Sequence, residues 1–255
     1  MNGLLPVGVA AVVGACVGSF LTVCVARWPE GRSVVSPRSR CLNCKSRLAW
    51  WENVPVLGFL LVRGRCRRCG ERLSAMYPVV EVAVALIWAG MTSQWGVHPE
   101  AVRGSLFLTL LLGIALTDAR QYVIPDEFSV GGCVIGVALA ALPGGPSLAD
   151  AVLGAGLGFG LLWVVAKLGR LVFGKDAMGG GDIKMMAMVG AFLGPAGVLF
   201  TLFSGALLGS AIFGPIAFRT ARLVPFGIFL AIGAAVAYGW GDPLIAWYLA
   251  LLGMN

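Results

Sequence analysis

The sequence predicts an all-α polytopic membrane protein, with about eight transmembrane helices and one cytoplasmic four-cysteine loop domain. Three observations lead to this fold class. The chain of 255 residues is 58% hydrophobic and only 12% charged, with a mean hydropathy of +0.88. Several apolar runs reach the roughly 20 residues needed to cross a bilayer. Two CxxC pairs lie in a basic segment between the first two runs. A chain of this composition could not present a polar surface to water.

The apolar runs predict the transmembrane elements in order. Each is expected to be a helix, because lipid offers backbone groups no partner and the alternating pattern of a barrel is absent. The run at 184–193 is short and is followed by Gly194-Pro195, which predicts a half-helix continuing into the next span. The expected spans lie near Leu4–Val25, Tyr77–Trp95, Ala101–Thr117, Glu127–Leu142, Leu148–Val172, Lys184–Leu193, Gly197–Phe218 and Val224–Trp240, with room for a short ninth element at Pro243–Leu252.

The first apolar run is expected to remain in the protein as a transmembrane helix. It is too long for a signal peptide, lacks a basic segment before it, and is followed by Arg27 rather than by a small-residue cleavage site. The domains expected from these runs are a first transmembrane helix at 1–26, a cytoplasmic loop domain at 27–76 and a transmembrane domain at 77–255.

The basic residues predict the orientation. All but one of the 19 lysines and arginines fall in or beside alternate connections, and Arg103 is the exception. By the positive-inside rule, that side is the cytoplasm. Anionic lipid headgroups are a sufficient partner for the net charge of +7, so no nucleic-acid partner is expected.

Four cysteines predict a zinc site in the loop domain. Cys41 and Cys44 form one CxxC pair, and Cys66 and Cys69 form the other. Disulfides rarely persist in a reducing cytoplasm, and two such pairs are typical of zinc held tetrahedrally by four thiolates. A redox dithiol is the alternative, but it needs one CxxC and not two. A closed four-thiolate site has no open position for water, which favours a structural role.

Two aspartates near the cytoplasmic boundary of the membrane are the candidate catalytic pair. Asp118 ends the third span, and Asp182 follows the glycine run at 179–181. Two carboxylates held close together in a partly desolvated site cannot both ionise, so one can act as a base and the other as an acid. The alternative for each is a solvated interfacial residue or a helix cap, and Asp182 could cap a helix beginning at Ile183. Another glycine run, at 154–160, imitates a nucleotide-binding pattern, but it lies in an apolar span and is expected to serve helix packing.

These motifs resemble those of the bacterial type IV prepilin peptidases, which are leader peptidases and N-methyltransferases of the GxGD type of intramembrane aspartic protease. The resemblance covers most of the chain. Three positions depart from the family pattern: Thr22, the Ala119-Arg120 pair after Asp118, and Ile228. The motifs that carry the resemblance are Gly18-Ser19-Phe20-Leu21-Thr22-Val23, Arg27-Trp28-Pro29, both CxxC pairs, Trp50 to Pro55, Arg63-Gly64-Arg65-Cys66, Tyr77-Pro78-Val79-Val80-Glu81, Gly179-Gly180-Gly181-Asp182 and Pro225-Phe226-Gly227-Ile228-Phe229-Leu230.

The resemblance implies an activity and its cofactors. It implies that Asp118 and Asp182 cleave the basic leader from type IV prepilins and type II secretion pseudopilins at the cytoplasmic face, which makes 77–255 a peptidase domain. Methylation of the new N-terminus with S-adenosylmethionine would follow. Gly64 is the position carried over for this second activity. Glu81 is a further candidate, which could hold the substrate's ammonium or the cofactor, or could pair with a loop arginine.

Three alternatives stay open from the sequence. In the first, the protein is a peptidase only, and the zinc loop serves substrate docking rather than methyl transfer. In the second it is a transporter, which would carry polar residues near the midplane of several spans. In the third it is a zinc-dependent assembly protein, which would need the cysteines but not the aspartates.

Overall fold

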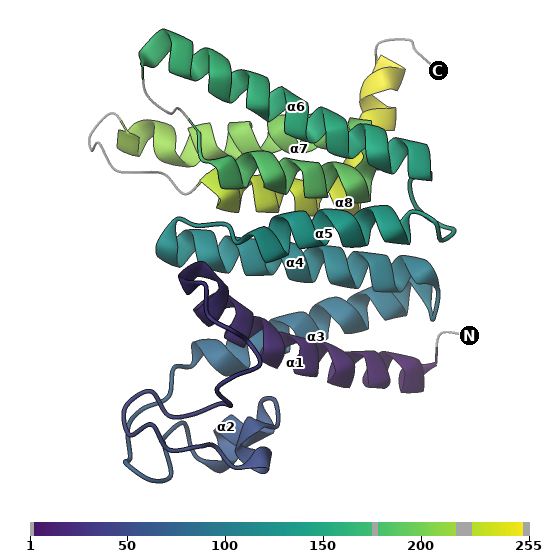
Figure 1. The fold of residues 1–255 in the computed structure, drawn as a ribbon. Helices are drawn as coiled ribbons and strands as arrows, with labels where there is room; N and C mark the ends of the chain where they lie inside the picture. The colour runs from purple at the N-terminus through teal and green to yellow at the C-terminus, as the bar shows by residue number, and fades with distance from the viewer. Residues whose placement is uncertain (1–2, 175–177, 218–225, 252–255) are drawn as a thin grey trace. The chain divides into compact units, whose positions relative to one another are not determined.

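The computed structural model describes residues 3–174, 178–217 and 226–251, and all regular secondary structure in these ranges is helical. Two short 3-10 helices cover Trp28–Glu30 and Trp50–Asn53. The α-helices, labelled in Figure 1, are α1 (Leu4–Arg27), α2 (Leu57–Leu61), α3 (Met76–Trp95), α4 (Pro99–Gln121), α5 (Asp126–Leu139), α6 (Leu148–Phe173), α7 (Gly180–Ala217) and α8 (Phe226–Leu251). The predicted all-α fold is confirmed for the described part of the chain.

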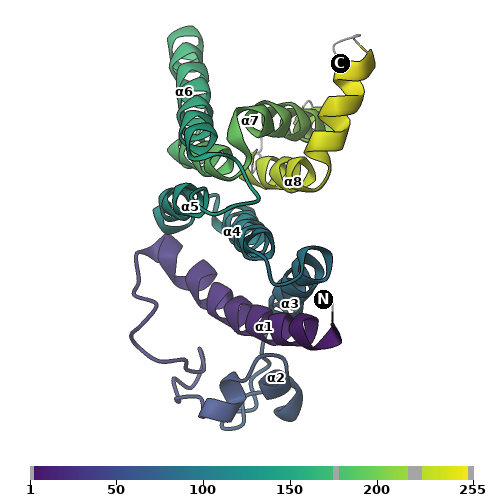
Figure 2. The ribbon, with the colours of Figure 1, turned by 90° about the vertical axis from the view of Figure 1, so that its right-hand side faces the viewer.

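The helices fall into two compact units, residues 1–109 and 110–255. In the first unit α1 and α3 lie side by side, as both Figure 1 and Figure 2 show. Glycines permit this close packing, because a Cβ at Gly14 would lie 2.8 Å from the carbonyl oxygen of Val84. A Cβ at Gly18, one turn later, would lie 2.8 Å from the Cα of Glu81. Small residues four apart are the usual means by which transmembrane helices approach each other.

In the second unit α6 packs against α7 through the glycine run that imitates a nucleotide-binding motif. A Cβ at Gly154 would overlap the carbonyl oxygen of Gly190, and one at Gly158 would overlap that of Met186. In contrast, Gly156 and Gly160 have open space at their Cβ positions. The predicted packing role of the run is therefore confirmed.

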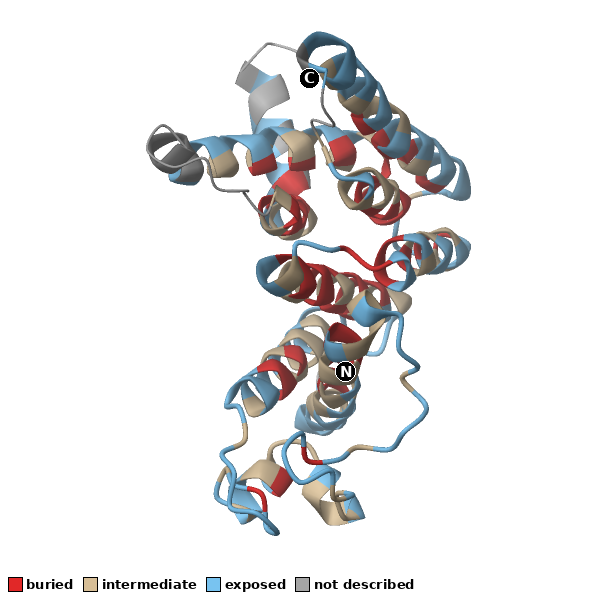
Figure 3. Cartoon of the chain, turned by 60° about the vertical axis from the view of Figure 1, so that its left-hand side comes forward, coloured by how far each residue is buried: buried red, intermediate tan, exposed pale blue. Residues whose placement is uncertain are grey.

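The core of the second unit lies along the first half of α7. Met185, Met186 and Met188 are fully buried there, with 0% exposure. The sulfur of Met188 would lie 2.6 Å from a Cβ at Gly132 of α5, so α7 contacts α5 on one side and α6 on the other. Figure 3 shows the buried residues on the sides of the helices that face one another, with exposed residues along their outer sides.

Five of the described helices are long and apolar enough to cross a membrane, namely α1, α3, α4, α6 and α7. Two pairs of predicted spans are joined. The spans at 184–193 and 197–218 form the single helix α7, and the predicted break is present as a non-helical Gly194, with φ 70° and ψ −175°. The two C-terminal elements form α8, which contains Pro243. Residues 218, 224–225 and 252 of the predicted elements lie outside the described residues.

The start of α7 corrects the alternative in which Asp182 is a helix cap. The helix begins at Gly180, so Asp182 lies inside its first turn and does not cap a helix beginning at Ile183. Glycine has a low helix propensity, which favours a later helix start. Here the helix begins at Gly180 instead, and Gly181 in its first turn packs against Ile124.

Candidate functional site

The second unit brings the two candidate catalytic aspartates together. Asp118 lies near the C-terminal end of α4 and is only 6% exposed. Asp182 lies in the first turn of α7, within electrostatic range of the Asp118 carboxylate. The two residues are far apart in sequence, so it is the tertiary fold of this unit that places their side chains near each other.

The N-terminus of α8 points at Asp118. The backbone N–H of Ile228, in the first turn of α8, donates a hydrogen bond to Asp118 Oδ2 at 3.1 Å. The positive end of a helix favours a carboxylate at this position. Gly227 permits the approach, because a Cβ there would lie 2.9 Å from Asp118 Oδ2. This contact between α8 and Asp118 is not visible in the sequence, although Gly227 belongs to one of the motifs that carry the family resemblance.

Ile124, in the connection between α4 and α5, contacts the first turns of both α7 and α8. A Cβ at Gly181 would lie 2.9 Å from Ile124 Cβ, and a Cβ at Gly227 would lie 2.9 Å from Ile124 Cδ1. The first turns of α7 and α8 therefore both pack on one side chain. Gly180 has open space at its Cβ position, whereas Gly181 does not. This difference is a physical reason for a G-x-G-D pattern in which the residue before the aspartate is glycine and the one before that varies.

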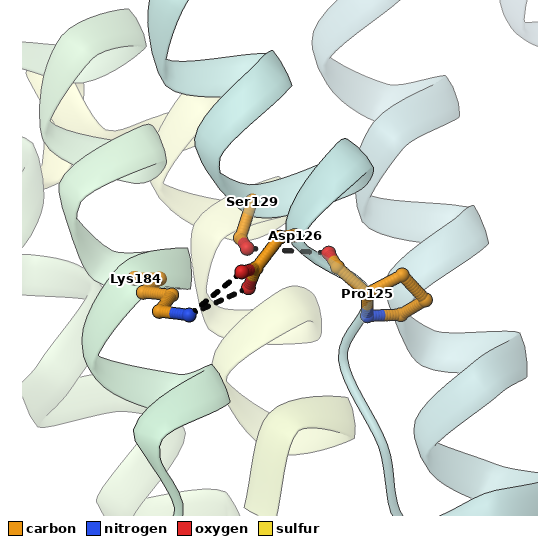
Figure 4. A network of polar contacts seen from close by, with 4 residues as sticks. All are labelled: Pro125, Asp126, Ser129 and Lys184. Carbon is orange, nitrogen blue, oxygen red and sulfur yellow. Dashed lines mark hydrogen bonds and ion pairs between the residues drawn. The ribbon is translucent and has the colours of Figure 1, made fainter. Parts of the chain in front are cut away.

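An ion pair anchors the first turn of α7 to α5. Lys184 donates to both carboxylate oxygens of Asp126, at 2.7 and 2.8 Å, and Figure 4 shows the pair. Ser129, one turn along α5, donates to the carbonyl oxygen of Pro125 at 3.2 Å (Figure 4). The pairing of Lys184 with Asp126 was missed, and no sequence signal joins these two positions.

The four cysteines form a cluster in the first unit. Their sulfur atoms all lie within 4.8 Å of one another, with Cys41 and Cys69 at 3.8 Å and Cys44 and Cys66 at 3.9 Å. Zinc–sulfur bonds of about 2.3 Å in a tetrahedron place the sulfurs roughly 3.8 Å apart. The two shorter pairs match this spacing, and the cluster can hold a four-thiolate zinc ion once its wider pairs, up to 4.8 Å apart, draw together.

Each CxxC pair sits in the same kind of tight turn. The N–H of Lys45 donates to the carbonyl of Cys41, and the N–H of Gly70 donates to that of Cys66. Both Lys45 and Gly70 have positive φ, at 57° and 73°. The Ser46 hydroxyl lies 3.0 Å from the Cys44 sulfur, and this hydrogen bond is the main cause that lowers the pKa of Cys44 to about 6. The lowered pKa favours the thiolate of Cys44, which is the form that binds metal.

The cluster is also the core of the loop that carries it. Within residues 28–75, the buried residues are Cys41, Gly58 and Cys66, and the remainder is intermediate or exposed. A segment with so little buried apolar surface needs another source of stability, and a structural metal can supply it.

Gly64 and Glu81 contact the two ends of α2. Gly64 has φ 65°, and its Cβ position would lie 2.9 Å from the ring of Phe59, so glycine is required there for structural reasons. Glu81 of α3 is 7% exposed, and its Oε2 accepts a hydrogen bond of 2.7 Å from the backbone N–H of Val56. The structure thus gives Glu81 a backbone partner in place of a loop arginine. The role of both residues in cofactor binding stays a prediction.

A cavity of ≈ 390 Å³ lies beside the glycine run that precedes Asp182. It was not anticipated from the sequence. Its lining combines cationic, aromatic and backbone groups: Trp163, Ala166, Lys167 and Arg170 of α6, together with Met178, Gly179, Gly180 and Ile183.

The chain matches the sequence patterns of two protein families. The Bacterial Peptidase A24 N-terminal domain matches residues 12–95, and the Type IV leader peptidase family matches residues 105–214. No solved structure matches the chain at a comparable level of significance.

Curated relatives named prepilin leader peptidase/N-methyltransferase match most of the chain. The protein from Pseudomonas putida is 36% identical over 96% of this chain and 94% of its own length. The protein from Bacillus subtilis is 32% identical over 94% of this chain and 96% of its own length. The protein from Myxococcus xanthus is 38% identical over 79% of this chain, which spans 60% of that relative's length. These matches confirm the resemblance seen in the motifs, and the chain belongs to the type IV leader peptidase family.

Proposed function

We propose that this protein cleaves the basic leader peptide from type IV prepilins and type II secretion pseudopilins at the cytoplasmic face of the inner membrane. Asp118 and Asp182 are the acid–base pair. The enzyme then methylates the new N-terminal residue with S-adenosylmethionine. Membership of the family and the names of the relatives support the reaction class. A single observation carries the residue assignment. Asp118 of α4, which accepts from the first turn of α8, lies within electrostatic range of Asp182 in the first turn of α7.

The surroundings of the pair suit hydrolysis of a peptide bond. One carboxylate, in its ionised form, takes a proton from a water molecule, and the resulting hydroxide attacks the carbonyl carbon of the scissile bond. The other carboxylate, in its protonated form, donates to the carbonyl oxygen. When the tetrahedral intermediate collapses, the C–N bond breaks and the leaving amine receives a proton from the pair. Gly181 and Gly227 carry no side chains, which leaves the two helix starts free to approach the pair and Ile124.

The loop at residues 27–76 that carries the four cysteines, here called the cysteine module, supports methylation as a structural element. Cys41, Cys44, Cys66 and Cys69 would hold zinc, and the closed set of four thiolates leaves no position for a reacting group. S-adenosylmethionine would supply the methyl group to the amine that cleavage exposes. The alternative is a peptidase only, whose module docks the substrate. The two versions differ in one product, the methylated N-terminus.

The test is cleavage of a purified prepilin by the full-length enzyme, with the products weighed by mass spectrometry. Asp118→Asn and Asp182→Asn preserve side-chain size but remove the acid–base function, so each should lower the cleavage rate by roughly 10²- to 10⁴-fold. Addition of S-adenosylmethionine should increase the mass of the mature product by one methyl group. A mature product whose mass never changes would favour the peptidase-only alternative.

A matched control separates catalysis from a general effect of losing a carboxylate. Asp150 also lies in the first turn of a helix, in the α6 capping arrangement with Ser147, where its N–H donates to the Ser147 hydroxyl. Asp150→Asn should leave the cleavage rate close to that of the wild type. Normal cleavage by either Asp118→Asn or Asp182→Asn would refute the proposed pair.

A further inference from the structure

The short helix α2 presents an apolar face that no part of its own module covers. Leu57, Leu60 and Leu61 are 58%, 61% and 68% exposed, and Trp50 of the preceding 3-10 helix is 83% exposed. These residues belong to one packed substructure, because Gly58 lies directly against the backbone of Glu52. Few soluble surfaces leave three leucines and a tryptophan together in water.

The neighbouring tryptophan shows that this exposure is selective. The Trp51 ring lies under the guanidinium of Arg67, at 5.1 Å from the ring centroid, and so packs within the module. The neighbouring Trp50, in contrast, is 83% exposed. Tryptophan is enriched where a membrane meets water, since one end of its ring system is apolar and the other can donate a hydrogen bond.

A hydrogen bond fixes the depth of α2 relative to a membrane-spanning helix of the same unit. Glu81 of α3 accepts from the N–H of Val56, which immediately precedes α2. Glu81 lies five residues after Met76, where α3 begins, so it is about 7 Å along the helix from that end. With its 20 residues, α3 is about 30 Å long, which is close to the thickness of the hydrocarbon layer. The start of α2 is thus held at the level of the first turns of the span and not beyond its end.

The backbone at this junction is itself suited to a place with little water. Val56 has φ 60° and ψ −53°, and the N–H of Leu57 donates to the carbonyl of Pro55 at 2.6 Å, which together describe a strained γ-turn. Such a turn leaves the Val56 N–H without a helical partner. The Glu81 carboxylate supplies one, as backbone groups at membrane depth require.

The charges around α2 complement an anionic lipid surface. Arg63 and Arg65 follow the helix directly, and the segment at 27–76 contains many more basic than acidic side chains. Basic residues next to an apolar face are the pattern of segments that lie in the headgroup region of a membrane. From the depth, the exposure and the charge we infer that α2 lies in the bilayer interface on the basic side, with Leu57, Leu60, Leu61 and Trp50 in contact with acyl chains.

Photo-crosslinking of the full-length protein in nanodiscs tests this inference directly. A benzoyl-phenylalanine is placed at Leu61, the nanodiscs contain phosphatidylethanolamine and phosphatidylglycerol, and adducts are identified by mass spectrometry after illumination. Leu86 in the α3 span, 67% exposed, is the positive control for lipid contact. Leu42 in the first CxxC turn, 76% exposed, is the matched control outside α2. We expect lipid adducts at Leu61 and Leu86 and none at Leu42.

Three patterns overturn the inference. Adducts at Leu61 with this chain or with a second copy would show that protein covers α2. If Leu86 reacts with lipid and Leu61 with nothing, α2 faces water. Equal lipid labelling at Leu42 and Leu61 would show that the contact is not specific to α2.

A second variant tests what holds the helix at that depth. Glu81→Ala removes the acceptor for the Val56 N–H, whereas Glu81→Gln keeps an amide oxygen that can accept the bond. The lipid adduct at Leu61 should be lost with Glu81→Ala and retained with Glu81→Gln, while the adduct at Leu86 persists in both. An unchanged Leu61 adduct in Glu81→Ala would refute the role of this hydrogen bond.

Discussion

A single methyl group at Gly227 should disable the enzyme without unfolding it. In Gly227→Ala the new Cβ would lie 2.9 Å from Asp118 Oδ2, 3.1 Å from Asp118 Cγ and 2.9 Å from Ile124 Cδ1. Unstrained non-bonded contacts of a methyl carbon begin at about 3.5 Å. The Asp118 carboxylate or the first turn of α8 must therefore move by roughly 0.5 Å or more. Either movement stretches the hydrogen bond from the Ile228 N–H, which is 3.1 Å long.

The expected cost follows from these distances. Adding a methyl group to a packed site destabilises a protein by roughly 1–3 kcal/mol, which a folded membrane domain can absorb. Displacing a catalytic group by about 1 Å lowers a rate by on the order of 10²-fold. Leader cleavage in Gly227→Ala should therefore fall by roughly one to two orders of magnitude, while the protein remains folded.

The assay compares cleavage rate and thermal unfolding in Gly227→Ala and in Gly239→Ala. Gly239 lies on the same helix, α8, and has nothing within 4 Å of its Cβ position. Its replacement should leave cleavage unchanged and, by helix propensity, stabilise by up to about 1 kcal/mol. Wild-type cleavage by Gly227→Ala, or an equal loss of activity in both variants, would show that the contact with Asp118 does not govern catalysis.

Three further predictions concern the other contacts. Gly181→Ala should impair cleavage because its Cβ would lie 2.9 Å from Ile124. The new Cβ of Gly180→Ala meets open space, so this variant should cleave normally. The reverse order of the two variants in a cleavage assay would contradict the packing explanation of the G-x-G-D motif. Reversing the charge at Asp126 or at Lys184 should slow cleavage a few-fold, since a partly exposed ion pair contributes roughly 0.2–1 kcal/mol. The double exchange should restore the cleavage rate. Additive effects in the double variant would argue against coupling through this pair. Cys41→Ser should lose bound zinc, measured by elemental analysis, and lower methylation more than proteolysis; metal content equal to that of the wild type would exclude this cluster as the site.

Local patterns were sufficient for several features of the fold. The CxxC spacing predicted the cysteine cluster, because two ligands with two residues between them converge in a tight turn. Gly194-Pro195 predicted the break in α7, since proline removes a backbone donor and glycine tolerates a positive φ. The small-residue run at 154–160 predicted a helix contact, although only alternate glycines take part in it.

The rest depended on contacts between distant segments. The sequence indicated Asp118 and Asp182 but not the N-terminus of α8 against Asp118, because the helix start and the carboxylate are 110 residues apart. The pairing of Lys184 with Asp126 was hidden for the same reason, because the two residues are 58 positions apart. Helix starts were also set by packing, as the contact of Gly181 with Ile124 shows.

The small number of buried residues in the cysteine module has a consequence for its evolution. A domain with an apolar core constrains many positions at once, because each core side chain must fit its neighbours. Here the cluster and a few turn positions, such as Gly64 and Gly70, carry most of the constraint, and the intervening surface has little to fit against. Insertions in this loop outside α2 and the arginines that follow it should therefore be tolerated far more readily than in the bundle.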